Sequence, residues 1–201
     1  MLIPFTSLYS KYKPQITGIL HVGAHECEEE SDYHKHGFKK IIWLEALQEK
    51  VDKFPDKNIY QIVVDSDDNK DVIFNITNNF QSSSIYELDE HAIEHPTIHV
   101  IEKRNMTTKR IDTLFNEKSI PTDFANFINL DIQGNELNAL KSLGDIINNI
   151  NYIYTEVNTK YLYKNCCLLN EIDNYLTDFT RVETKMTKHG WGDAFYIRKT
   201  K

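Results

Sequence analysis

A glycine turn and a distant carboxylate form the clearest chemical pattern in this sequence. The apolar residues 19–22 lead into Gly23, and a second apolar run, residues 41–44, ends at Glu45, 22 residues after that glycine. Doubly wound sheets bind a nucleoside with a unit of three elements. A first strand enters a glycine turn, a helix follows, and a second strand ends at an acidic residue. At this spacing the acid hydrogen-bonds a pair of ribose hydroxyls, so Glu45 is the candidate ribose ligand.

The glycine content of the turn limits which nucleoside it can hold. Pyrophosphate binding uses a G-x-G-x-x-G turn, in which the backbone amides approach the phosphates closely. Here Gly23 is present, but His25 and Cys27 stand where small residues are expected. A nicotinamide-dependent oxidoreductase is therefore disfavoured. An adenosine ligand without phosphates, such as S-adenosylmethionine, needs one close backbone approach and the ribose carboxylate, and it fits better.

Polar residues end further predicted strands. Asp131 follows the run 127–130, and the run 152–155 leads into Glu156 and Asn158. Ligands of open parallel sheets bind at the carboxyl ends of the strands. Any single carboxylate at the end of a strand is as often a helix cap as a ligand-binding group. The prediction of a binding site therefore depends on four polar strand ends that lie at the same edge of the sheet.

Alternating apolar runs and amphipathic segments predict the elements that carry these residues. We expect strands at 19–22, 41–45, 59–64, 127–131 and 152–156, with helices at 28–36, 49–54, 134–144 and about 168–176. Segments 180–187 and 193–198 predict a closing antiparallel hairpin. Strands and helices that alternate with short connections form a parallel sheet with right-handed crossovers, so the fold class is α/β, doubly wound.

Two segments depart from this alternation. Residues 1–17 contain Pro4, Pro14 and scattered aromatic residues, which predicts a short lead-in packed on the domain. Residues 66–110 contain a strand at 72–76 and a polar loop at 77–84, which predicts an inserted hairpin or flap over the sheet's edge. We expect one domain over residues 1–201.

Composition excludes several functional classes. The chain has 201 residues, of which 40% are hydrophobic and 26% charged, with a net charge of -7. A negative chain lacks the cationic face that nucleic acid binding needs. No apolar run of about 18 residues is present and the first residues do not resemble a signal peptide, so we expect a soluble, cytoplasmic protein. Its three cysteines show no disulfide-scaffold spacing.

Five segments in order resemble the FkbM family of S-adenosylmethionine-dependent methyltransferases. They are His21-Val22-Gly23-Ala24-His25, Trp43-Leu44-Glu45-Ala46, the loop 78–84, the segment 128–136 with Asp131-Ile132-Gln133-Gly134-Asn135-Glu136, and Gly190-Trp191-Gly192-Asp193. The resemblance spans nearly the whole chain. It implies a class I methyltransferase fold, a seven-stranded sheet with the last strand antiparallel, S-adenosylmethionine as cofactor, and O-methylation of hydroxyls, often on sugars or polyketide-type products.

The resemblance also implies roles for individual residues. Gly23 and Ala24 would meet the methionine portion and Glu45 the ribose, while Asp65 and the loop serines 82–84 are candidates for the adenine side. Asp131 would lie beneath the sulfonium or beside the acceptor. The predicted cofactor-binding residues are His21, Gly23, Ala24, His25, Glu45, Ala46, Asp65, Ser82, Ser83 and Asp131. Cys27 departs from the family, which usually has a second glycine there, and would either narrow the methionine site or face the helix.

Methyl transfer needs an in-line acceptor oxygen and gains from a base that takes the hydroxyl proton. The candidate catalytic residues are Asp131, Glu156 and His189. As an alternative without a dedicated base, Asp131, Glu156 and Asn158 would hold one Mg²⁺ that activates the hydroxyl. No metal is assigned. Zinc is disfavoured because the histidines lack ligand spacing.

The acceptor is predicted only as a class. Aromatic residues near the C-terminus would either stack on a sugar ring or belong to the core; they are Tyr161, Tyr163, Trp191, Phe195 and Tyr196. We expect an O-methyltransferase for a small polar acceptor, a sugar, nucleotide-sugar or glycan. The alternatives are a non-catalytic nucleoside-binding module of the same fold and, less favoured, an NAD-dependent oxidoreductase. The oligomeric state is not predicted.

Overall fold

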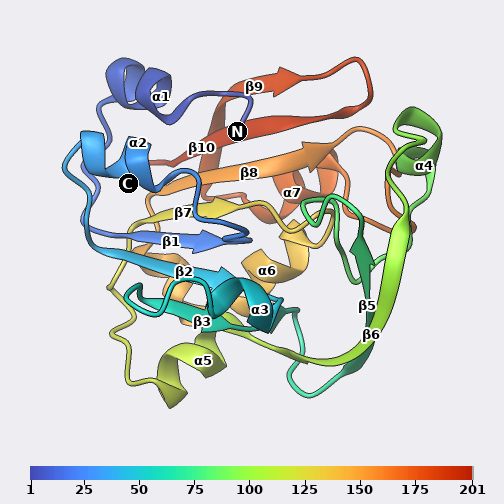
Figure 1. The fold of residues 1–201 in the computed structure, drawn as a ribbon. Helices are drawn as coiled ribbons and strands as arrows, with labels where there is room; N and C mark the ends of the chain where they lie inside the picture. Colours follow the sequence, from blue (N-terminus) through green and yellow to red (C-terminus); the bar gives the residue numbers. More distant parts are fainter. Residues whose placement is uncertain (201) are drawn as a thin grey trace.

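A seven-stranded sheet forms the centre of the computed structural model, which describes residues 1–200. The strand order is β3-β2-β1-β7-β8-β10-β9 (Figure 1). The strands are β1 Ile19–Val22, β2 Ile41–Glu45, β3 Ile59–Gln61, β7 Phe127–Leu130, β8 Tyr152–Asn158, β9 Phe179–Met186 and β10 Trp191–Arg198. β10 runs antiparallel to both β8 and β9, whereas β1, β2, β3, β7 and β8 pair in parallel. The predicted α/β fold with an antiparallel C-terminal hairpin is confirmed.

Helices cover both faces of the sheet, which explains why its central strands are buried and almost entirely apolar. Side chains alternate between the faces, so that Leu20 packs with α5, α6 and α7 while Ile19 packs with α1 and α2. The helices are α1 Phe5–Tyr12, α2 Glu30–Lys35, α3 Gln48–Val51, α5 Ile111–Glu117, α6 Glu136–Ser142 and α7 Leu169–Tyr175. The 3₁₀ helix η1 Gly144–Asn149 follows α6. This two-sided packing fixes the strand ends in one plane.

The insertion forms a second, three-stranded sheet of order β4-β6-β5. Its strands are β4 Val63–Val64, β5 Asp71–Thr77 and β6 Val100–Lys109, and the short helix α4 Glu90–Glu94 lies between β5 and β6. Figure 1 shows the β5–β6 hairpin standing across the ends toward which β1, β2, β7 and β8 point. The predicted insertion after the third strand therefore covers the carboxyl edge of the main sheet.

The single strand predicted at 59–64 is wrong. Residues 59–61 pair with β2 as β3, but Val63 and Val64 pair with Thr108 and Lys109 of β6. The chain changes sheets at Ile62, whose N–H donates to the Glu45 carbonyl. This crossover is what joins the insertion to the main sheet.

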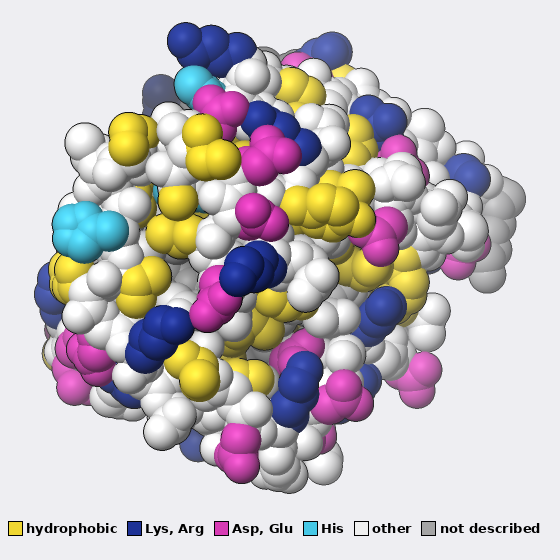
Figure 2. All heavy atoms as spheres, turned by 90° about the vertical axis from the view of Figure 1, so that its right-hand side faces the viewer, with side chains coloured by type: hydrophobic (Ala, Val, Ile, Leu, Met, Phe, Trp, Pro, Cys, Tyr) yellow, Lys and Arg dark blue, Asp and Glu magenta, His cyan; other side chains and the backbone are white. Residues whose placement is uncertain are grey.

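The surface over the insertion mixes side-chain types. In Figure 2, Lys, Arg, Asp and Glu side chains lie between hydrophobic ones across this face. Within residues 1–200, no helix combines the length and apolarity required to cross a bilayer.

Candidate active site

Two adjoining cavities lie at the carboxyl edge of the parallel strands, beneath the insertion. The space between protein atoms is about 660 Å³ in the first and about 1310 Å³ in the second, and both volumes include space that is open to solvent. Both are lined by Gly23, His25, Gln81, Asp131 and Gln133. These shared residues come from the ends of β1 and β7 and from the loop after β5, so the junction of the cavities is the place where three chain segments meet.

Gly23 forms the tight turn after β1. Its φ is +92°, and a β-carbon there would lie 1.9 Å from the Asp131 carbonyl oxygen. A side chain at this position would therefore collide with the neighbouring strand end, in a conformation that favours glycine. The N–H groups of Gly23 and Ala24 both donate to the Leu44 carbonyl at 2.9 Å. The turn is thus tied to β2, with its first two amides already used.

Glu45 closes the first cavity at the end of β2. Its carboxylate accepts hydrogen bonds from the N–H of Leu47, at 2.9 Å, and from the N–H of His25, at 2.8 Å. Burial raises the pKa of Glu45, and these backbone donors oppose the increase. Two amides leave further lone-pair positions on the two oxygens, so this carboxylate can still accept hydroxyl donors from the cavity.

The remaining wall of the first cavity is mostly apolar. Ile62 and Val63 come from the β3–β4 crossover, and Phe74, Phe80 and Ile85 come from the insertion. An apolar slot that ends at a carboxylate suits a flat heteroaromatic base attached to a ribose. Neither phosphate-binding glycines nor a lysine or arginine line it among the described residues.

Gln133 joins two carboxylates at the second cavity. Its Nε2 donates to Asp131 Oδ1 at 2.6 Å and to Glu156 Oε2 at 2.9 Å. Its φ of +56° turns the side chain back over the strand ends, and its Oε1 accepts the Tyr163 hydroxyl at 2.6 Å. Burial, then the charges of Asp131 and Glu136, raise the pKa of Glu156 well above its ordinary value. Glu156 therefore holds its proton more tightly than an ordinary carboxyl does.

Glu136 holds the loop that carries Asp131 and Gln133. It is fully buried, and its Oε1 accepts the N–H groups of Ile132 at 3.0 Å and Gly134 at 3.1 Å. Burial raises its pKa to about 7. Glu136 therefore caps the loop from inside the protein rather than lining either cavity.

The wall of the second cavity carries polar atoms without partners. His91 Nδ1 and Asn129 Oδ1 are buried and make no hydrogen bond within the described residues. Burial, and then His95, lower the pKa of His91 to about 4, so its imidazole is neutral at pH 7. Glu28, Glu29 and Asp193 line the same cavity. This wall is rich in groups that accept hydrogen bonds.

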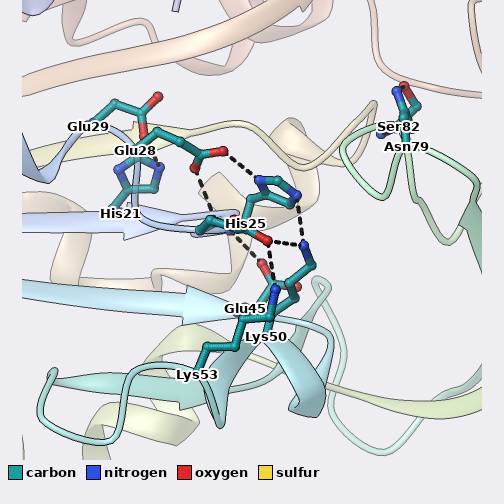
Figure 3. A network of polar contacts seen from close by, with 10 residues as sticks. His21, His25, Glu28, Glu29, Glu45, Lys50, Lys53, Asn79 and Ser82 are labelled. Carbon is teal, nitrogen blue, oxygen red and sulfur yellow. Dashed lines mark hydrogen bonds and ion pairs between the residues drawn. The ribbon is translucent and has the colours of Figure 1, made fainter.

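A polar network surrounds the loop after Gly23. Glu28 Oε1 lies 2.6 Å from His25 Nδ1, and Lys50 Nζ lies 3.1 Å from His25 Nε2. Lys50 also donates to Glu26 Oε1 at 2.8 Å, as does the exposed Lys53. Figure 3 shows His25 between Glu28 and Lys50, with Asn79 and Ser82 on the separate loop of the insertion.

Comparison with known proteins decides the family. The model of the methyltransferase FkbM domain matches residues 21–190. This chain belongs to the FkbM methyltransferase family. The match contains the turn at Gly23, Glu45, the insertion and the Asp131 loop, and with them the whole lining of the first cavity. The second cavity lies within it except for Met1, Trp191 and Asp193.

Two solved structures are similar to this FkbM methyltransferase. The methyltransferase domain of bacterial CtHen1 is 9% identical with a TM-score of 0.42, and the match covers 96% of this chain and 95% of that one. A SAM-dependent methyltransferase from Anabaena variabilis is 8% identical with a TM-score of 0.42, over 99% of this chain and 86% of that one. No curated protein matches significantly.

Most of the predicted cofactor residues of this FkbM methyltransferase lie at the cavities. The first cavity is lined by Glu45, Ala46 and Ser83, the second by His21 and Ser82, and both by Gly23, His25 and Asp131. The contact of each with a cofactor stays a prediction.

Two predicted cofactor residues lie outside the cavity linings. Asp65 is fully buried and engaged by Lys70 Nζ at 2.9 Å, because the chain has already turned into β4 when it reaches this residue. Ala24 packs in the core beneath α2 and offers only backbone. Ser84, which the adenine side also included, donates to the Gln133 carbonyl instead. These three residues contact other protein groups and line neither cavity.

The predicted catalytic residues separate. Asp131 and Glu156 lie together, whereas His189 is outside both linings and bonds Glu94 Oε2 at 2.6 Å. The closing hairpin places His189 beside α4, at the rim. Asn158 also lies outside the cavities, with both amide atoms buried and without partners. Among residues 1–200, no three His, Cys, Asp or Glu side chains are grouped to hold a metal ion.

The predicted aromatic residues and Cys27 differ in whether they line a cavity. Tyr163 and Trp191 line the second cavity, but Phe195 and Tyr196 are buried in the core and Tyr161 points to solvent. Cys27 is 5% exposed and packs in the core under α2, and burial raises its pKa to about 12. It lines neither cavity, so it faces the helix side rather than narrowing the methionine site.

Sequence reasoning missed Gln133, Glu28 and Lys50 as site residues. Gln133 lies inside the most specific family segment, two residues from Asp131, and this adjacency was the available signal. Glu28 belongs to a run of four acids, Glu26 and 28–30 with Cys27 between, that reads as a solvated helix start. Lys50 gave no signal, because only tertiary packing buries it.

Proposed function

We propose that this FkbM methyltransferase transfers the methyl group of S-adenosylmethionine to a hydroxyl of a small polar acceptor, a sugar, nucleotide-sugar or glycan. One observation carries the proposal: the two cavities meet at Gly23, Asp131 and Gln133. With adenosine in the first cavity and the acceptor in the second, the sulfonium methyl lies at their junction. An in-line displacement requires this arrangement.

The first cavity fits the adenosyl group by its own residues. Glu45 accepts the ribose hydroxyls, the apolar slot takes adenine, and Gly23 lines the cavity without a side chain. S-adenosylmethionine supplies an activated methyl group on sulfur. The protein then has to orient the acceptor and exclude water, which for ideal orientation lowers the barrier by up to ~7–11 kcal/mol.

Asp131 and Glu156 are the proposed proton acceptors. They share the Gln133 amide, and Glu156 holds its proton more tightly than an ordinary carboxyl. A carboxylate with a raised pKa is a stronger base for a hydroxyl proton, and general base catalysis contributes ~10²–10⁴-fold. His189 takes no part in this proposal, because its imidazole is engaged by Glu94 at the rim.

The second cavity supports a polyhydroxylated acceptor. Its wall offers carboxylates and the free Asn129 Oδ1 as acceptors for hydroxyl donors, and Trp191 and Tyr163 provide aromatic faces for a sugar ring. Lysine and arginine are absent from its lining in the described part of the chain. The diphosphate of a nucleotide-sugar would therefore remain outside the cavity, with only the sugar inside.

We also propose a cellular location for the protein. The three cysteines are free thiols. Free thiols are typical of a reducing compartment, and we propose the cytoplasm. Fractionation of cells that express the protein would test this, and recovery from an oxidising compartment would contradict it.

Calorimetry with S-adenosylmethionine and S-adenosylhomocysteine tests the cofactor. We expect both to bind, and failure of both would refute the methyltransferase proposal. Transfer of a labelled methyl group to a panel of sugars, nucleotide-sugars and glycans tests the acceptor, with base-stable ether linkage of the label as the mark of O-methylation. Binding without transfer to any acceptor in the panel would favour a non-catalytic module.

A further inference from the structure

Glu28 presents a fixed carboxylate to the second cavity, next to the junction with the first. Its Oε1 lies 2.6 Å from His25 Nδ1, and its Oε2 accepts the Glu26 N–H at 3.1 Å. The side chain remains about half exposed, at 48%, and it lines the second cavity beside His25 and Gly23. Each oxygen therefore has one partner in the protein and one lone pair free for a ligand in the cavity.

Lys50 determines how His25 meets Glu28. A lysine ammonium can only donate, so the bond of 3.1 Å between Lys50 Nζ and His25 Nε2 makes Nε2 the acceptor. The imidazole proton then lies on Nδ1 and points at Glu28. Burial alone would raise the pKa of Glu28, but the hydrogen bonds from His25 and the backbone outweigh it and the pKa is lowered. Glu28 is therefore held as an oriented anion.

The position of Lys50 is itself fixed. It is 5% exposed, which is rare for lysine, and it contacts three groups from two segments. Its ammonium bonds His25 and Glu26 of the loop after β1 and lies 4.8 Å from the ring centre of Phe80, on the insertion. Figure 3 shows Lys50 reaching up from α3 to His25. A network with so many fixed members costs free energy to order, and Glu28 is the carboxylate that it presents to the second cavity.

Three backbone N–H groups of the loop are already used within the protein. The N–H groups of Gly23 and Ala24 donate to Leu44, and that of His25 donates to Glu45. These amides are therefore not available to a ligand's acceptor atoms, whereas a ligand ammonium needs an acceptor, which the Glu28 carboxylate supplies. Glu29 is the neighbouring alternative, but burial raises its pKa and it faces the buried His21 at 3.9 Å.

We propose that Glu28, oriented by the His25–Lys50 pair, binds the α-ammonium group in the methionine portion of S-adenosylmethionine. The inference rests on the proposed function, since it assumes adenosine in the first cavity. A ligand that leaves the first cavity past Gly23 enters the second beside Glu28. The carboxylate and the ammonium then form a charge-assisted hydrogen bond. His25 and Lys50 are positioning residues in this account.

Two ligands separate this contact from the rest of the site. S-adenosylhomocysteine carries the amino acid, and 5′-methylthioadenosine has the same adenosine and thioether without it. By calorimetry, Glu28→Gln is expected to weaken S-adenosylhomocysteine ~10–100-fold and to change methylthioadenosine less than about twofold. The analogue of S-adenosylhomocysteine that lacks only the amino group should bind the wild type weakly and lose nothing further in Glu28→Gln.

Lys50 and Lys53 provide a matched pair of variants. Both donate to Glu26 Oε1, but only Lys50 contacts His25. Lys50→Met is expected to weaken S-adenosylhomocysteine about 3–10-fold with methylthioadenosine unchanged, whereas Lys53→Met leaves both unchanged. His25→Asn keeps an N–H donor in a residue that tolerates the φ of +43° and should retain most of the affinity.

The outcomes separate this inference from the proposed function. If the wild type binds neither ligand, the proposed function fails and the inference fails with it. If the wild type prefers S-adenosylhomocysteine and Glu28→Gln weakens both ligands equally, or neither, the inference alone is overturned. A loss specific to S-adenosylhomocysteine and absent for the analogue without the amino group supports it.

Discussion

The α-carbon of Gly23 lies so close to Asp131 that a β-carbon would approach the carbonyl oxygen of residue 131 to 1.9 Å. The turn after β1 and the end of β7 are therefore in direct backbone contact. Any change that separates them alters both cavities together, because both residues line both.

Gly23→Ala is expected to destabilise the protein by more than ~2 kcal/mol, because the methyl group collides with backbone that cannot move freely. Gly37→Ala is the matched control: its φ is +87°, close to the +92° of Gly23, but a β-carbon there meets nothing within 4 Å. The control should cost only the left-handed conformation, ~1–2 kcal/mol. Urea unfolding of both variants measures the difference, and equal losses would contradict the close approach.

Glu45→Gln is expected to weaken both S-adenosylhomocysteine and methylthioadenosine ~10-fold or more, since both ligands contain the ribose. This contrasts with Glu28→Gln, which should distinguish them. Glu49→Gln, which removes an exposed partner of Arg104 at 3.0 Å, serves as control. Calorimetry that finds unchanged affinity for Glu45→Gln would rule out a ribose contact.

Glu156→Gln is expected to reduce methyl transfer ~10²–10⁴-fold. It should leave the affinity for S-adenosylhomocysteine within about twofold, because the proposal gives Glu156 a contact with the acceptor hydroxyl and none with the cofactor. In the wild type, transfer should increase as pH rises through the raised pKa of Glu156, where the carboxyl becomes able to accept a proton. A variant with the same pH profile as the wild type would show that the base is another group.

Glu136 makes stability depend on pH. Its folded pKa of about 7 lies above its ordinary 4.5, so its contribution is fully present below about pH 4.5 and is lost as pH rises through 7. Glu136→Gln keeps an oxygen for the two loop amides and removes the titration. Relative to the wild type, we expect the variant to gain stability between pH 5 and 8, by up to a few kcal/mol. Thermal melts at both ends of this range measure the gain, and parallel pH curves would exclude Glu136 as its origin.

Removal of divalent metals tests the alternative mechanism. The Gln133 amide takes one oxygen of Asp131 and one of Glu156, and Asn158 lies outside the cavity lining. We therefore expect transfer in EDTA to stay within about twofold of the untreated rate. Loss of activity in EDTA with recovery in Mg²⁺ would instead establish a metal-assisted reaction.

Particular residues show where prediction from the sequence succeeded. The bounds of β1 and β2 were predicted to the residue. A short, continuous apolar run between turn-forming residues is typical of a parallel strand that is buried on both faces of a sheet. Asp131 and Glu156 were brought together by topology alone, since parallel neighbours end at the same edge. The strand at 59–64 failed, because one apolar run can pair with two different sheets and periodicity does not name the partner.

The sequence by itself determined the family, the doubly wound sheet and the edge at which the chemistry must occur, since these follow from local apolar patterning, the turn at Gly23 and the ordered motifs. Only the tertiary structure decided which polar residues face the cavities. Asp65 and His189 lie outside the cavity linings, Gln133 and Glu28 lie in them, and Lys50 is buried against His25. The physical reason is that side-chain direction and burial depend on contacts between segments far apart in the chain. Lys50, for example, meets Phe80 only because the insertion folds back over the Gly23 turn.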